Sequence, residues 1–107
     1  MSEFELSDLG DGQFTLAGDL SFGTAEQIRR ASETQFDGQA SIEINLSHVE
    51  TTDSAGLALL LEWIGWANHS NVEIRFLNIP EKILAIAQTA EVGELLSGTY
   101  SSSQPTP

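Results

Sequence analysis

Apolar and polar residues alternate along several short stretches of the chain, a pattern typical of β-strands with one buried face. The alternation covers residues 4–6, 14–16, 42–46 and 72–76. Leu9-Gly10-Asp11-Gly12 separates the first two stretches and predicts a hairpin turn. A strand that is covered by helices on both faces of its sheet has a continuous apolar sequence rather than an alternating one. The alternation therefore predicts a sheet with helices on one face only.

Three helices are predicted between and after these strands. The first begins near residue 25 and ends at Asp37-Gly38, the second covers about 54–68, and the third begins at Pro80. Strands that alternate with helices imply parallel crossover connections. We therefore predict an α/β fold: a mixed, mostly parallel four-stranded sheet with an N-terminal hairpin.

The length of 107 residues predicts one domain with a core of its own. We place this domain at residues 1–96. The remaining residues, 97–107, are rich in Ser, Thr and Pro, and we predict a disordered polar tail there. The chain has no cysteine, which excludes disulfides and thiolate metal sites.

The charge balance limits the classes of partner. Sixteen acidic residues against four basic ones give a formal net charge of -12, which repels nucleic-acid phosphates and anionic lipid headgroups. No apolar run approaches the roughly 18 residues of a membrane span, and the N-terminus lacks the apolar region of a signal peptide. We therefore expect a cytoplasmic protein that binds no nucleic acid, does not insert into a membrane, and takes any membrane role through a protein partner.

The second predicted helix is apolar around most of its circumference. Beside its regular core stripe, Leu59, Trp63 and Trp66 fall on an adjoining arc. In one interpretation, flanking helices cover this arc. In the other, part of the arc is a partner-binding surface, because aromatic anchors are enriched at interface hot spots. A combination, with one Trp buried and the other docking, is equally compatible with the pattern.

The loop before this helix, Asp53-Ser54-Ala55-Gly56, carries candidate binding groups. Asp53 or Ser54 can cap the helix and complement its dipole. Thr51, Thr52 and Ser54 place three hydroxyls in one loop, and Gly56 allows close approach of another backbone. A phosphate on Ser54 would lie near the positive end of the helix but beside the Asp53 charge. The loop is thus a predicted docking surface with a possible phosphorylation site at Ser54.

Catalytic chemistry is not predicted. His48, Asp53 and Ser54 are the residue types of a hydrolase triad, but the sequence has no nucleophile elbow. His48 and His69 alone do not make a metal site, and the single lysine, Lys82, follows no phosphate-binding loop. We therefore expect no enzyme activity, no metal and no cofactor.

The central motif resembles that of the STAS domain family (sulphate transporter and anti-sigma factor antagonist). It consists of Leu46-Ser47-His48-Val49, then Asp53-Ser54-Ala55-Gly56, then a Leu-rich helix, while Leu16-Ala-Gly-Asp-Leu20 matches the early strand and loop of the family. The resemblance covers about residues 4–96. It implies a small α/β binding module that is not an enzyme.

Two branches of the family imply two kinds of partner. In anti-sigma factor antagonists, the serine matching Ser54 is phosphorylated by a kinase-like anti-sigma factor. In the MlaB branch, the domain is a subunit of an ABC transporter that moves phospholipid to maintain outer-membrane lipid asymmetry, and it binds the ATPase subunit. Leu57-Ala-Leu-Leu-Leu61 and the polar tail after Leu96 favour the MlaB branch, whereas Ser54, where MlaB-type chains often carry Thr, keeps the phosphorylation switch open. An acid-rich oligomeric module is a third alternative.

The resemblance implies that the partner is bound by the loop and the start of the following helix. The predicted partner-binding residues are Thr52, Asp53, Ser54, Ala55, Gly56, Leu59, Trp63 and Trp66.

Overall fold

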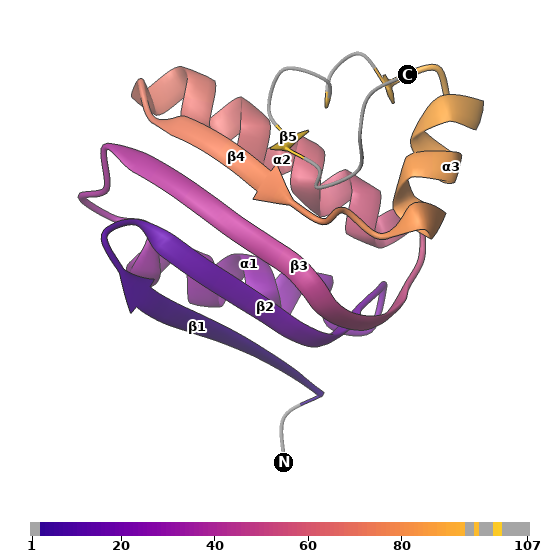
Figure 1. Ribbon diagram of the computed structural model, residues 1–107, viewed down its shortest axis with the longest axis horizontal. Helices are drawn as coiled ribbons and strands as arrows, with labels where there is room; N and C mark the ends of the chain where they lie inside the picture. Colours follow the sequence, from indigo (N-terminus) through magenta and orange to yellow (C-terminus); the bar gives the residue numbers. More distant parts are fainter. Residues whose placement is uncertain (1–2, 94–95, 97–99, 102–107) are drawn as a thin grey trace.

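The computed structural model describes residues 3–93, 96 and 100–101 (Figure 1). Its elements, in chain order, are β1 (Phe4–Gly10), β2 (Gln13–Leu20), α1 (Ala25–Gln35), β3 (Ser41–Thr52), α2 (Ser54–Ser70), β4 (Glu73–Leu77), α3 (Glu81–Thr89) and β5 (Tyr100–Ser101).

The strands form one sheet in the order β1-β2-β3-β4-β5. β1 and β2 are antiparallel, and every other neighbouring pair is parallel. The predicted N-terminal hairpin and the mostly parallel sheet are thereby confirmed. The two-residue strand β5 adds a fifth strand within the segment predicted to be a disordered tail; the other tail residues lie outside the described residues.

One face of the sheet is buried, as the alternation predicts. Ile42, Ile44 and Leu46 of β3 are at most 1% exposed, whereas the residues between them are half-buried. α1 and α2 lie behind the sheet in Figure 1 and pack against this buried face. α3 packs on α2 and buries Ile83 and Ala87.

The carboxyl ends of β2 and β3 lie side by side, with Leu20 paired to Thr52. α1 follows the first of these strands after a short loop, and α2 follows the second directly. In open parallel sheets, binding sites lie at the carboxyl ends of the strands, where such loops meet. The Asp53–Gly56 motif lies at this edge.

Candidate functional site

The side chain of Asp53 joins two loops at this edge. Asp53 is the N-cap of α2, and its Oδ1 accepts a hydrogen bond from the Ala55 backbone N–H at 2.8 Å. Its Oδ2 accepts a second one, at 3.1 Å, from the backbone N–H of Phe22 in the β2–α1 loop. The capping residue is therefore Asp53 rather than Ser54, and its carboxylate fixes the position of Phe22 relative to α2.

The three hydroxyls predicted to share this loop have different surroundings. Thr51 Oγ1 donates to Asp19 Oδ1 at 2.8 Å. Thr52 is only 9% exposed, so this member of the predicted contact loop is buried beneath α2. Ser54 is exposed at the first position of the helix. Of the two hydroxyl residues in the predicted contact loop, Thr52 and Ser54, only Ser54 is exposed.

Gly56 allows α2 to begin directly on the ends of the strands. A Cβ atom on Gly56 would lie 2.4 Å from Thr52 Oγ1 and 2.9 Å from the Leu20 carbonyl oxygen. The predicted close approach is therefore made by the chain's own backbone and side chains. Gly56 itself is buried, so it shapes the start of α2 without being exposed at its surface.

Leu59 and Trp63 of the predicted arc on α2 are buried, as in the alternative in which a flanking helix covers them. Their side chains are 4% and 3% exposed, because α1 packs beside α2 and covers them. Trp63 Nε1 donates a hydrogen bond to Ser32 Oγ of α1 at 2.9 Å. Trp66 is only half-buried, and it is the one member of the arc that remains accessible.

The sequence interpretation missed Phe22. Its side chain is 87% exposed, although it lies in the loop that Asp53 holds. A hollow of about 310 Å³ beside Phe22 extends between the first turns of α1 and α2 and is lined in part by Ala55 and Ala58. A large aromatic residue in the otherwise small and polar segment Ser21-Phe22-Gly23 is the signal that could have revealed it.

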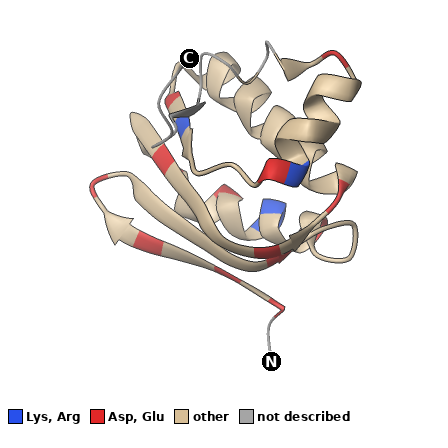
Figure 2. Cartoon of the chain, turned by 45° about the vertical axis from the view of Figure 1, so that its right-hand side comes forward, with Lys and Arg blue, Asp and Glu red and all other residues tan. Residues whose placement is uncertain are grey.

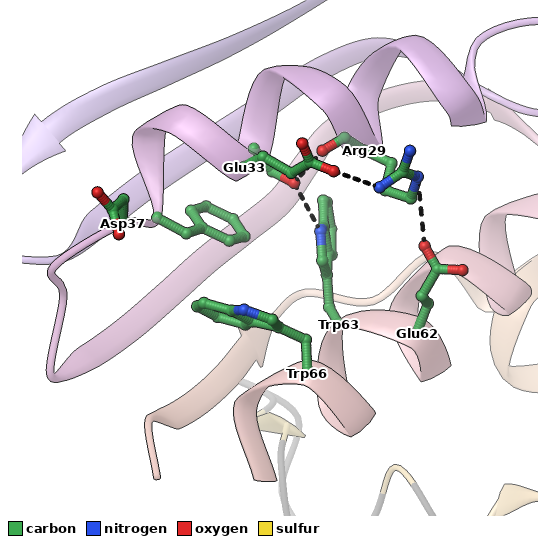
Figure 3. Close-up of a pocket in the computed structure, with 8 residues that line it drawn as sticks. Arg29, Glu33, Asp37, Glu62, Trp63 and Trp66 are labelled. Atoms are coloured by element: carbon green, nitrogen blue, oxygen red, sulfur yellow. Dashed lines mark hydrogen bonds and ion pairs between the residues drawn. The ribbon is translucent and has the colours of Figure 1, made fainter. Parts of the chain in front are cut away.

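A network of ion pairs ties α1 to α2 next to this hollow. Arg29 pairs with Glu26 at 2.9 Å. It also pairs with Glu33 on its own helix, and its Nε lies 3.6 Å from Glu62 Oε2 on α2 (Figure 3). The hydrogen bonds from Arg29 lower the pKa of Glu26 from 4.5 to about 2, and Arg30 contributes to the shift. The same pairing raises the pKa of Arg29.

This lowered pKa predicts a pH-dependent contribution to stability. A carboxyl whose pKa is lower in the folded state stabilises the fold above its unfolded pKa, here 4.5, and loses that contribution as the pH falls through about 2. Glu26→Gln should therefore reduce the free energy of unfolding at pH 7, and its difference from wild type should vanish near pH 2. Urea unfolding across this pH range tests the expectation; a difference that persists unchanged at pH 2 would contradict it.

Charge is distributed unevenly over the surface. In Figure 2 the acidic positions are spread over strands, loops and helix starts, while the few basic positions are confined to α1, β4 and α3. Within the described part of the chain, no group of three or more His, Cys, Asp or Glu residues is arranged to hold a metal ion. None of the described helices has the length and apolar character needed to cross a membrane.

Comparison with protein families gives a match over most of the chain. A family model described as "Mlab, STAS domain" matches residues 7–97. The chain belongs to the STAS domain family. Within the family it is most like the MlaB type, as the sequence motif predicted. A search of curated proteins gave no match.

Several solved structures share the fold of this chain. The anti-sigma factor antagonist SpoIIAA in its unphosphorylated form is 21% identical, with a TM-score of 0.65 over 96% of this chain and 89% of that chain. The phosphorylated Bacillus SpoIIAA is also 21% identical, with a TM-score of 0.68 over 94% and 91%. A putative anti-sigma factor antagonist from Thermotoga maritima is 17% identical, with a TM-score of 0.71 over 94% and 87%. At these identities the similarity establishes a common fold for this STAS domain.

Proposed function

We propose that this STAS domain is a non-catalytic cytoplasmic subunit that binds and regulates the ATPase of an ABC transporter for phospholipids, which maintains outer-membrane lipid asymmetry. The match to the MlaB-type family model supports the transporter assignment. The observation that carries the docking role is the exposure of Phe22 beside the start of α2, where Asp53 holds it. We call Phe22, Ser54, Ala55 and Ala58 the docking face.

The docking face has the chemistry of a protein interface. Phe22 can insert a rigid aromatic ring into a partner, and such anchors contribute most of the binding energy at interfaces. The small side chains of Ala55 and Ala58 line the hollow beside it. The carboxylate of Asp53 is hydrogen-bonded to two backbone N–H groups, so it positions the face. These features support binding rather than catalysis.

The second candidate function is that of an anti-sigma factor antagonist switched by phosphorylation of Ser54. The exposure of Ser54 and the likeness to a phosphorylated SpoIIAA favour it. A phosphate at the first helical residue would be favoured by the helix dipole and opposed by the adjacent Asp53 carboxylate. In this alternative the partner is a kinase-like anti-sigma factor, and the same docking face would contact it.

The ATPase of the organism's phospholipid transporter should bind the wild-type chain and bind Phe22→Ala more weakly. Loss of an aromatic anchor costs about 2 kcal/mol or more, which is roughly a 30-fold weaker Kd. Leu9→Ala is the matched control, because Leu9 is 62% exposed on the distant hairpin and should leave the Kd unchanged. Isothermal titration calorimetry with purified proteins gives the Kd values.

Ser54→Asp tests the role of the loop and separates the two candidate functions. A new carboxylate on the docking face should weaken ATPase binding by like-charge repulsion and desolvation. Unchanged affinity for both Phe22→Ala and Ser54→Asp would contradict the proposed site. Transfer of phosphate from ATP to Ser54 by a kinase-like protein, with no affinity for the ATPase, would establish the anti-sigma factor antagonist instead.

A further inference from the structure

A second hollow lies further along the groove between α1 and α2 (Figure 3). Its volume is about 350 Å³, within the range of roughly 300–1,000 Å³ that small ligands occupy. Its aromatic lining consists of Phe36, Trp63 and Trp66. None of the residues of the docking face lines this hollow.

The aromatic lining leaves one ring accessible. Phe36 and Trp63 are 2% and 3% exposed, and their ring centroids lie 5.5 Å apart. Trp66 lies 5.9 Å from Phe36 but is only half-buried. Because the face of an indole ring attracts cations, Trp66 offers a cation-binding surface inside the hollow.

Acidic residues predominate around these rings. Glu33, Asp37 and Glu62 line the hollow against the single guanidinium of Arg29. In Figure 3, Arg29 and Glu62 lie at one end, whereas Asp37 lies at the other, beyond Trp66. Among the described residues, no ion pair is made by Asp37. The end of the hollow near Trp66 and Asp37 is therefore negative, in a chain whose net charge is -12.

This hollow adjoins the docking face. Arg29 and Glu62 line both this hollow and the one beside Phe22, so the two hollows are neighbours along α1 and α2 and share the Arg29–Glu62 ion pair. A partner segment that covers Phe22 and continues along the groove would reach Trp66 next. The charge of the lining then determines which side chain of that segment fits.

We infer that the hollow receives an arginine side chain of the partner, stacked on Trp66 and paired with Asp37. The inference rests on the proposed function, because the arginine belongs to the segment that covers the docking face. A guanidinium suits the site better than an ammonium, since it is planar, weakly hydrated, stacks on aromatic faces and forms forked hydrogen bonds to carboxylates. Arg29 keeps its own partners at the other end of the hollow.

Butylguanidinium, which represents the arginine side chain, is the first probe, and it requires no partner protein. The chain contains only two tryptophans, so a ¹H–¹⁵N spectrum shows two indole N–H signals, and Trp66→Phe assigns them. We expect the Trp66 signal to shift saturably with butylguanidinium at constant ionic strength. Butylurea, the neutral analogue, should cause no saturable shift, and butylammonium should bind more weakly.

The matched variants are Asp37→Asn and Glu73→Gln. Removal of the Asp37 charge should weaken butylguanidinium binding about threefold to fivefold, as expected for an exposed ion pair. Glu73 is exposed on β4 and does not line the hollow, so Glu73→Gln should leave the affinity unchanged. Absence of saturation, an equal response to butylurea or butylammonium, or an unchanged affinity of Asp37→Asn would overturn the inference.

A final comparison separates this inference from the proposed function. Asp37→Asn should also weaken ATPase binding about threefold to fivefold, while Glu73→Gln should not. If Phe22→Ala weakens the complex and Asp37→Asn does not, the arginine site is wrong and the docking function stands. If the ATPase does not bind the wild-type chain at all, the proposed function is wrong. The inference that the arginine belongs to the ATPase is then wrong as well.

Discussion

Trp63→Ala should lower the free energy of unfolding by about 3–5 kcal/mol, the usual cost of truncating a buried Trp or Phe. Trp63 is 3% exposed, and its ring lies between Phe36 at 5.5 Å and Phe76 at 6.4 Å. Alanine would leave a cavity where α1, α2 and the sheet meet. It would also remove the hydrogen bond that Ser32 Oγ accepts. Because a small domain has only about 5–15 kcal/mol of stability, this loss is severe.

Urea unfolding followed by far-ultraviolet circular dichroism measures the effect without relying on tryptophan fluorescence. Trp66→Ala in the same helix is the control, and it should cost less than half as much, because Trp66 is already half-buried in the folded state. Equal costs for the two variants would mean that the two rings are equally buried. A Trp63→Ala protein with nearly wild-type stability would restore the interpretation of this ring as a docking anchor.

The local pattern of the sequence predicted the arrangement of the fold, because each strand has one buried face. It did not predict the full length of β3, which runs from Ser41 to Thr52, well past the end of the alternation at Leu46. The additional residues belong to the strand because they pair with β2, as Leu20 does with Thr52. Such pairing joins residues that are far apart in the chain, so the local alternation of apolar and polar residues does not predict it.

The candidate site was predicted only in part, for a similar reason. Helix capping is local, so the role of Asp53 could be predicted from its place before α2. Its hydrogen bond to Phe22 spans 31 residues, and the exposure of Phe22 follows from where that loop is held. The angular positions of Leu59 and Trp63 around α2 could be predicted, but the presence of α1 over them depends on tertiary packing. The local pattern therefore left open which residues of the arc are covered.

Gly56→Ala and Gly65→Ala should change stability in opposite directions, although both replace a glycine in α2. At Gly56 the new Cβ would lie 2.9 Å from the Leu20 carbonyl oxygen and 2.4 Å from Thr52 Oγ1, so backbone must move. Overpacking of this kind costs about 1–3 kcal/mol. Around Gly65 no atom lies within 4 Å of a new Cβ, and there alanine should add about 0.5–1 kcal/mol through its higher helix propensity.

Thermal and urea unfolding of the two variants measure this difference in sign, with wild type as the reference. The opposite result at Gly56, a stabilised protein, would show that α2 does not lie against the ends of β2 and β3.

Displacement of α2 by the Gly56→Ala substitution would also move Ala55 and Ala58 away from Phe22. Phe22 lies in the neighbouring loop, and its backbone N–H is bound by the side chain of Asp53. We therefore expect Gly56→Ala to weaken ATPase binding as well, and Gly65→Ala to leave it unchanged. The smallest residue in the motif would thus keep the two halves of the docking face together.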